Sequence, residues 1–247
     1  MVNTVPVYVI NIPCELRRYT SFMDKTGKFY TDLTRIDPPT LHSREVTNIV
    51  RTFAVKSVKT SREISNKLSF VLALEDALRK KHRNIVIFED DAVPAVEDAP
   101  KQVENLIRLL PEDYSICYLG GYIRPYKTLN IKGIESEFLQ LGNDKDRHKV
   151  WGAHAILYNI RVYEHLIKAF RAKSKILTDT YLHSSLPDEY KRFFSRTVLY
   201  WQDREGVSKC NHGTSLHGPV FNFRKMEKDT EKFLTDVCRK NVVKISP

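Results

Sequence analysis

The chain has 247 residues, of which 42% are hydrophobic and 28% are charged, and the aromatic residues include 12 tyrosines and 12 phenylalanines. This composition is typical of a globular protein with an apolar core, and it excludes collagen-like, low-complexity and disulfide-scaffold proteins. The net charge is +10, because 40 Lys and Arg residues stand against 30 Asp and Glu residues. The length suits one domain of ordinary size, with room for a C-terminal elaboration.

The positive charge is concentrated in the second half of the chain. Residues 1–123 contain 17 basic and 16 acidic residues, whereas residues 124–247 contain 23 basic and 14 acidic residues. Such an excess favours an anionic partner, and phosphates, nucleic acid and acidic lipid headgroups are the candidates. A basic surface that is simply well solvated is an equal alternative at this point.

The cysteines and the hydrophobic runs bear on the compartment. Cys14, Cys117, Cys210 and Cys238 are far apart and form no CxxC motif, so we infer a reducing compartment and no zinc knuckle. The N-terminal apolar run lacks a basic segment before it, and no stretch approaches the ~20 apolar residues of a membrane span. We therefore expect a cytoplasmic protein, in the host cytoplasm if viral, without integral membrane association.

The first half of the chain alternates between strand and helix patterns. Short apolar, β-branched runs predict strands, and apolar residues at helical spacing predict helices. In chain order we expect strands at 5–12, 33–36 and 52–58, a helix at 65–81, a strand at 84–88, a helix at 99–110 and a strand at 115–119. This alternation is typical of an α/β fold.

The second half is less regular. The pattern predicts loops with edge strands over 124–149 and a strand over 150–158. It predicts helices over 161–173 and 227–239. No internal repeat or long linker divides the chain. We predict a single α/β domain over 1–247, with a mostly parallel central sheet flanked by helices and a C-terminal extension.

The strongest local feature is three consecutive carboxylates, Glu89, Asp90 and Asp91, directly after the predicted buried strand at 84–88. Ligands in open α/β sheets bind at the carboxyl ends of strands. Adjacent acids repel unless a cation lies between them, and Mg²⁺ or Mn²⁺ bound to a diphosphate would serve. An extended backbone would place Glu89 and Asp91 on one side and Asp90 on the other. The alternative is a solvated acidic turn.

Four segments around this triplet resemble the GT-A glycosyltransferases, specifically family 25, the lipopolysaccharide-biosynthesis and procollagen galactosyltransferase group. In the family's order they are YVIN at 8–11 followed by Arg17 and Arg18, the Leu68-Ser69 helix leading to IVIFEDDA at 85–92, ICYLGG at 116–121, and WGAHAILYN at 151–159 followed by DTYL at 179–182. The resemblance covers about residues 5–183. It implies a GT-A fold, with residues 1–123 binding nucleotide-sugar and metal and residues 124–247 binding the acceptor.

The resemblance also implies roles for single residues. Asp91 would be the principal ligand of Mn²⁺ or Mg²⁺, with Glu89 beside it and His212 or His217 completing the shell. The nucleotide-sugar donor, a UDP-sugar by preference, would contact a set comprising Asn11, Arg17, Arg18, Glu89, Asp90 and Gly152. His154 and Asp179 would be the catalytic residues, Asp179 as the base that takes the acceptor proton in an inverting reaction.

Each assignment has a structural alternative. The two arginines suit an ordinary surface, and His154 suits a buried core histidine. Asp179 suits a helix N-cap, and His212 and His217 suit a surface loop.

Three further functions stay open beside transfer to a glycan or lipopolysaccharide-type acceptor. The first is glycosylation of hydroxymethylated bases in phage or viral DNA. Residues 161–175 contain five basic residues, and a later segment interleaves charge with aromatic rings: Lys191, Arg192, Phe193, Phe194 and Arg196. The second is a non-catalytic glycosyltransferase-like module. The third is a nucleic-acid-binding protein without transferase activity. The retained acid triplet favours an enzyme.

Overall fold

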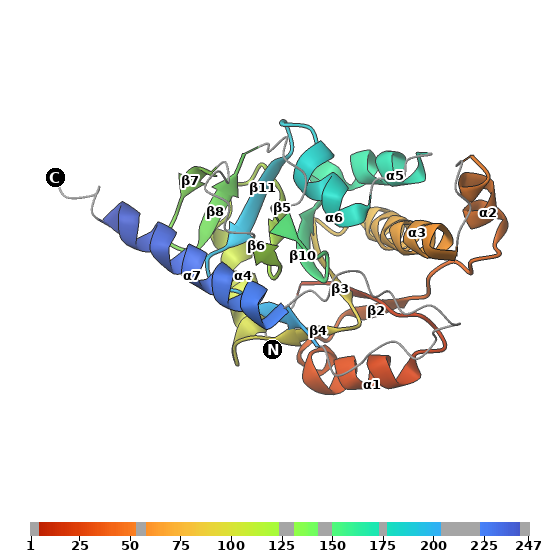
Figure 1. Ribbon diagram of the computed structural model, residues 1–247, viewed down its shortest axis with the longest axis horizontal. Helices are drawn as coiled ribbons and strands as arrows, with labels where there is room; N and C mark the ends of the chain where they lie inside the picture. Colours follow the sequence, from red (N-terminus) through yellow and green to blue (C-terminus); the bar gives the residue numbers. More distant parts are fainter. Residues whose placement is uncertain are drawn as a thin grey trace.

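The computed structural model describes residues 5–52, 58–123, 131–142, 150–172, 177–203 and 223–242. Its centre is an eight-stranded sheet with the order β2-β1-β3-β10-β5-β11-β8-β7 (Figure 1). The strands of this sheet are β1 (Val7–Ile10), β2 (Leu33–Ile36), β3 (Asn84–Glu89), β5 (Tyr114–Tyr118), β7 (Ile131–Ile134), β8 (Phe138–Leu141), β10 (Ala155–Asn159) and β11 (Lys191–Ser195). Strands from the two halves of the chain are interleaved, because β10 from the second half lies between β3 and β5 from the first half.

The sheet is mixed. β1 pairs in parallel with β2 and β3, and β5 pairs in parallel with β11. β10 is antiparallel to both of its neighbours, so β3 and β5 run the same way on either side of it. The carboxyl ends of β1, β2, β3, β5 and β11 therefore share one edge of the sheet, which is where α/β proteins bind ligands.

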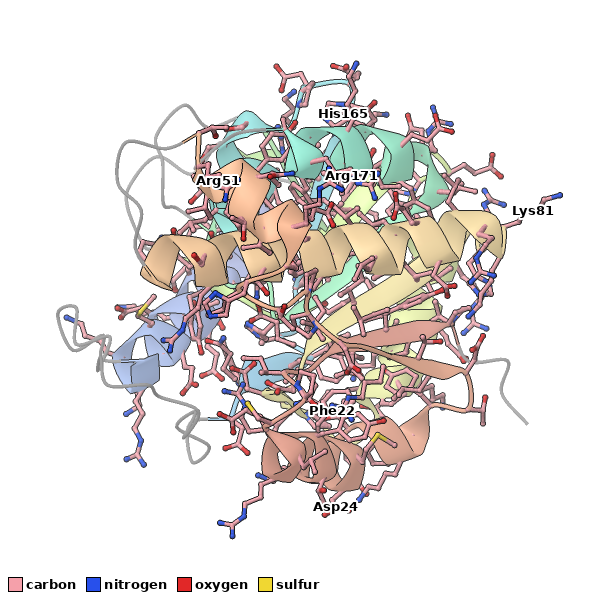
Figure 2. All side chains as sticks on the ribbon, turned by 90° about the vertical axis from the view of Figure 1, so that its right-hand side faces the viewer. Phe22, Asp24, Arg51, Lys81, His165 and Arg171 are labelled. Carbon is pink, nitrogen blue, oxygen red and sulfur yellow. The ribbon has the colours of Figure 1, made fainter. Side chains whose placement is uncertain are left out.

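Helices cover both faces of the sheet, which confirms the predicted α/β class. The helices are α1 (Leu16–Lys25), α2 (Arg44–Val50), α3 (Val58–Arg79), α4 (Ala99–Leu109), α5 (Tyr163–Arg171), α6 (Thr178–Thr180) and α7 (Phe223–Val242). Side chains alternate along β3, so Ile85 and Ile87 pack with α3 and α5, whereas Val86 and Phe88 pack with α1 and α4. Figure 2 shows Phe22 pointing from α1 toward the sheet and Asp24 pointing away from it.

Two short ribbons form separate two-stranded sheets. β4 (Ala92–Pro94) pairs with β12 (Tyr200–Gln202), and β6 (Tyr122–Ile123) pairs with β9 (Val150–Trp151), both antiparallel. The long helix α7 packs on β6, where the hydroxyl of Thr230 accepts a hydrogen bond from the backbone N–H of Ile123 at 2.9 Å. Within the described ranges, no helix combines the length and apolar character that crossing a membrane requires.

Several sequence expectations need correction. The predicted strand at 52–58 ends in α3, which begins at Val58, and residues 53–57 lie outside the described ranges. The predicted strand at 150–158 is divided into β9 and β10 at Gly152, whose φ of +93° breaks the extended backbone. Cys14 forms a disulfide, whereas the cysteine spacing predicted no pairing.

Candidate functional site

The acid triplet lies where β3 ends. Glu89 is the last residue of the strand, and its backbone N–H donates to the carbonyl of His154 on the neighbouring chain segment at 3.0 Å. Asp90 and Asp91 form the turn that leads into β4. The three residues were expected to point alternately to opposite sides of an extended backbone. This expectation is wrong after Glu89, because Asp90 and Asp91 lie in a turn.

The buried carboxylate of Asp90 is fixed by the end of β1. The side-chain amide of Asn11 donates to Oδ2 of Asp90 at 2.6 Å, and Arg18 pairs with Oδ1. Asn11 comes directly after Ile10, which pairs with Glu89 across the two strands. The sequence placed Asn11 at the site, and the structure shows that its direct partner is Asp90.

Arg18 provides a cation between two of the acids. Its Nη2 pairs with Asp90 and lies 3.2 Å from Oδ2 of Asp91. Arg17, one position earlier on α1, is exposed. Because consecutive helical residues point in different directions, only one of the two predicted arginines reaches the triplet. The positive charge required between the acids is thus partly supplied by the protein.

Glu89 differs from its two neighbours because no basic side chain among the described residues pairs with it. Burial and the nearby charge of Asp91 raise the pKa of Glu89 to about 8. Asn66 on α3 donates to Oε1 of Glu89 at 3.2 Å. The sequence analysis did not identify Asn66. The available signal was the presence of polar residues in a largely buried helix, where Ser65 and Ser69 are buried.

Asp91 offers a free ligand atom. Its Oδ1 is buried and has no hydrogen-bond partner in the part of the chain that the structure describes, and burial raises the pKa of its carboxyl group. The described residues contain no group of three or more His, Cys, Asp or Glu residues arranged to hold a metal. The unpartnered Oδ1 of Asp91 is one oxygen of the kind that Mg²⁺ accepts, and such a cation would have to take its other ligands from elsewhere, for example a bound diphosphate or water.

His154 is part of the packing. It is completely buried, its Nε2 lies 3.2 Å from the carbonyl oxygen of Tyr200, and burial lowers its pKa to about 4. A Cβ at Gly152 would lie 2.8 Å from Nδ1 of the same ring. The geometry matches the alternative of a core histidine, and it gives Gly152 a packing reason for being glycine.

Asp179 lies in the short helix α6 and is half-buried. The N-cap of that helix is Leu177, so the N-cap alternative for Asp179 does not hold. Its Oδ1 accepts the backbone N–H of Thr180 at 2.7 Å. The charge of Asp179 contributes to the raised pKa of Glu89, after burial and the nearer carboxylates. Asp179 therefore lies within electrostatic range of Glu89.

Two other expectations concern segments away from the triplet. His212 and His217 lie outside the described residues. In the basic and aromatic segment around β11, Arg192, Phe193 and Phe194 are buried in the central sheet. They are unable to contact an extruded base, so this segment does not support DNA binding.

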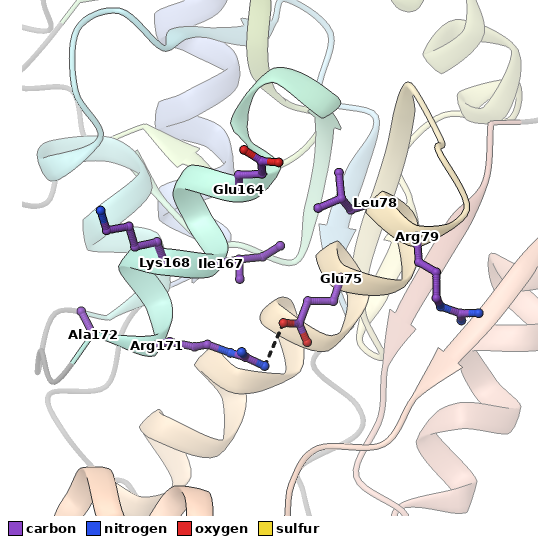
Figure 3. A pocket seen from close by; sticks show the side chains of 8 residues that line it. All are labelled: Glu75, Leu78, Arg79, Glu164, Ile167, Lys168, Arg171 and Ala172. Atoms are coloured by element: carbon purple, nitrogen blue, oxygen red, sulfur yellow. Dashed lines mark ion pairs between the residues drawn. The ribbon is translucent and has the colours of Figure 1, made fainter.

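A hollow of about 780 Å³ lies between α3 and α5, away from the triplet (Figure 3). It is bordered by Glu75 and Arg79 in the last turns of α3, which lead into the amino end of β3. Arg171 spans it to Glu75 at 2.8 Å. The carboxyl edge of the sheet, and not this hollow, is the candidate functional site.

No known family profile matches the sequence, and no curated protein shows significant similarity to it. Among solved structures, a glycosyltransferase involved in glycosylation of the major capsid of PBCV-1 is similar, with a TM-score of 0.40, 8% identity and coverage of 75% of this chain and 71% of that one. A197 from STIV has a TM-score of 0.40, 12% identity and coverage of 85% and 99%. Mannose-1-phosphate geranyltransferase from Thermus thermophilus has a TM-score of 0.40, 8% identity and coverage of 82% and 76%. Likenesses at this level do not assign an activity to the chain.

Proposed function

We propose that this protein is a glycosyltransferase that takes a sugar from a nucleotide-sugar donor at the carboxyl edge of its sheet. The observation that carries the proposal is the pairing state of the triplet. Asp90 is fully engaged by Asn11 and Arg18, whereas Asp91 keeps a buried, unpartnered oxygen and Glu89 has a pKa of about 8. The unpartnered oxygen of Asp91 and the crowding that raises the pKa of Glu89 both favour a bound cation, through which a diphosphate would be held.

Mg²⁺ or Mn²⁺ held by Asp91, with Glu89 beside it, would neutralise the departing nucleoside diphosphate. The residues of the chain have separate tasks in this proposal. Asn11 and Arg18 hold Asp90 and keep the turn in place, and Asn66 orients Glu89. The family resemblance favours a UDP-sugar as donor.

Asp179 is the proposed base for the acceptor in an inverting transfer. In that reaction the acceptor oxygen forms a bond to the anomeric carbon while the bond from that carbon to the diphosphate breaks. The acceptor proton passes to the Asp179 carboxylate, and the leaving diphosphate carries away the electron pair. The weak effect of the Asp179 charge on the pKa of Glu89 is consistent with a base on the same side of the molecule as the triplet.

A glycan is the acceptor that we propose. The alternative of modified DNA loses one of its two supporting segments because Arg192, Phe193 and Phe194 are buried, although the basic residues of α5 are exposed. A nucleic-acid-binding protein without transferase activity predicts strongly salt-dependent DNA binding and no response to nucleotide.

A thermal-shift series tests the proposed donor site. The wild-type protein is melted with UDP or GDP, with and without Mn²⁺, and we expect stabilisation only when nucleotide and metal are both present. Asp91→Asn should abolish that response, whereas Glu97→Gln, which removes an exposed acid beyond the turn, should retain it. Stabilisation by nucleotide that is indifferent to Mn²⁺ and to Asp91→Asn would contradict the proposed metal site.

A further inference from the structure

A second hollow, of about 620 Å³, lies between the β4–β12 ribbon, the β7–β8 turn and α7. Its lining includes one large aromatic side chain and several polar ones: Trp201, Glu137, Arg196, Thr197, Glu231 and Thr235. Neither the triplet nor the residues that hold it contribute to this lining. α7 runs past β6 (Figure 1) and forms one wall of the hollow through Glu231, Leu234 and Thr235.

The hollow lies along the same edge of the sheet as the acid triplet. β11 runs parallel to β5 and ends at Ser195, whose partner Phe138 begins β8. Glu137 and Arg196 directly adjoin that pair, so they mark the carboxyl end of β11. Because β3 and β5 point the same way, the triplet and the hollow occupy different positions on one ligand-binding edge.

One ribbon connects the two positions. Trp201 on β12 pairs with Val93 on β4, two residues after Asp91. The backbone N–H of Asp203, two residues after Trp201, donates to the carbonyl of Asp91 at 2.5 Å. A ligand that contacts Trp201 is therefore held by the same ribbon that fixes the backbone of the triplet.

The lining has the chemistry of a saccharide site. The indole of Trp201 stacks on Tyr122 with ring centroids 5.7 Å apart and an interplanar angle of 24°, which fixes its orientation. A fixed aromatic ring offers an apolar face to the C–H groups of a sugar ring. The carboxylates of Glu137 and Glu231 accept hydrogen bonds from sugar hydroxyls, and such charge-assisted bonds are stronger than neutral ones.

The charge of the lining distinguishes between acceptor classes. Glu137 and Glu231 provide two negative charges against the single positive charge of Arg196, which also donates to the carbonyl of Glu135 at 2.8 Å. A phosphate-rich ligand would be repelled there. We propose that this hollow is the acceptor subsite and that it binds an uncharged saccharide, an inference that rests on the proposed glycosyltransferase function.

Sugar binding to the free protein tests the inference. The chain has two tryptophans, so Trp151→Phe leaves Trp201 as the only indole fluorophore. A set of methyl glycosides of common hexoses and pentoses is titrated into this variant, and saturation-transfer NMR on the wild type gives an independent readout. We expect at least one glycoside to change the fluorescence of Trp201 and to receive saturation.

Two substitutions and a matched control assign the site. Trp201→Ala should weaken glycoside binding at least tenfold, and Glu231→Gln, on the exposed side of α7, should weaken it severalfold without touching the aromatic stack. Asp236→Asn removes an exposed acid of the same helix outside the hollow and should have no effect. If Trp201→Ala fails to fold, Glu231→Gln carries the comparison.

Both variants should keep the stabilisation by UDP and Mn²⁺, since that response depends on the triplet. Glycoside binding that is unaffected by either substitution would overturn the acceptor subsite, and so would the absence of any glycoside signal. Glycoside binding at Trp201 without any response to nucleotide and metal would leave the subsite standing and overturn the proposed donor site instead.

Discussion

The amide of Asn11 donates to the carboxylate of Asp90 at 2.6 Å, across a separation of 79 residues in the chain. The two residues follow the adjacent parallel strands β1 and β3, so the bond joins the ends of those strands. Arg18 pairs with the second oxygen of the same carboxylate. Asp90 therefore connects the ends of β1 and β3, whereas Asp91 and Glu89 are the carboxylates proposed to bind a ligand.

Arg18→Gln is expected to destabilise the protein. The side chains of Asp90 and Asp91 are only 8% and 20% exposed, so removing their shared cation leaves two crowded carboxylates uncompensated. Loss of one partner of a half-buried pair should lower the free energy of unfolding by about 1–3 kcal/mol. Arg17→Gln is the matched control, because Arg17 is exposed, and chemical denaturation of both variants gives the comparison. Equal stabilities of the two variants would argue against the pairing.

Gly152→Ala should also be destabilising, for a steric reason. The φ of Gly152 is +93°, and an added Cβ would lie 2.8 Å from Nδ1 of His154. Strain of this kind costs on the order of 1–3 kcal/mol. Gly133→Ala is the control, because its Cβ would meet only the side chain of Gln140, at 3.6 Å or more. The difference between the two melting temperatures measures the effect, and a neutral Gly152→Ala would contradict the described turn.

His154 gives the stability a defined pH dependence. Burial lowers the pKa of His154 from 6.5 to about 4, so between these pH values the unfolded state binds more protons than the folded state. Its contribution is complete above about pH 6.5 and is lost as the pH falls toward 4, by up to roughly 3 kcal/mol. Denaturation at a series of pH values should show a flatter slope in this window for His154→Gln. An unchanged slope would mean that His154 is not buried in its neutral form.

Asp179→Asn separates the acceptor step from donor binding. If Asp179 takes the acceptor proton, the substitution should lower kcat for transfer by at least about a hundredfold. Stabilisation by UDP and Mn²⁺ should persist, because the triplet is intact. Glu189→Gln, an exposed acid farther along the chain, is the control. Parallel loss of transfer and of nucleotide binding would assign Asp179 to the donor site instead.

Central strands such as β1 and β3 could be predicted because they are short, apolar and buried on both faces, and the partly buried edge strand β2 was also found. The expected strand at 33–36 coincides with β2, and the expected strand at 84–88 lies within β3. Helix α1 was missed although its apolar residues recur at helical spacing, because the segment is polar overall and Phe22 is the only fully buried residue among its ten. β11 and β12 were missed because their aromatic residues fit a strand and a loop equally well.

At the site, the sequence located the triplet but did not determine its partners. Nothing in the sequence distinguished Arg18 from Arg17, since the choice depends on the rotation of α1 against the strand ends. Asn66 and Asp203 reach the triplet through tertiary contacts that no local pattern encodes. The sequence also did not decide between a catalytic and a buried His154. Its burial depends on a tertiary contact with β12, where its Nε2 lies near the carbonyl oxygen of Tyr200.

The most direct test of the central claim is hydrolysis of a panel of UDP-, GDP- and CMP-sugars by the purified protein in Mn²⁺, repeated in EDTA and with Asp91→Asn. We predict slow turnover of one donor that requires metal and is abolished by Asp91→Asn, whereas Glu97→Gln retains it. Turnover of no donor in the panel, together with tight salt-sensitive binding to DNA, would contradict the glycosyltransferase account.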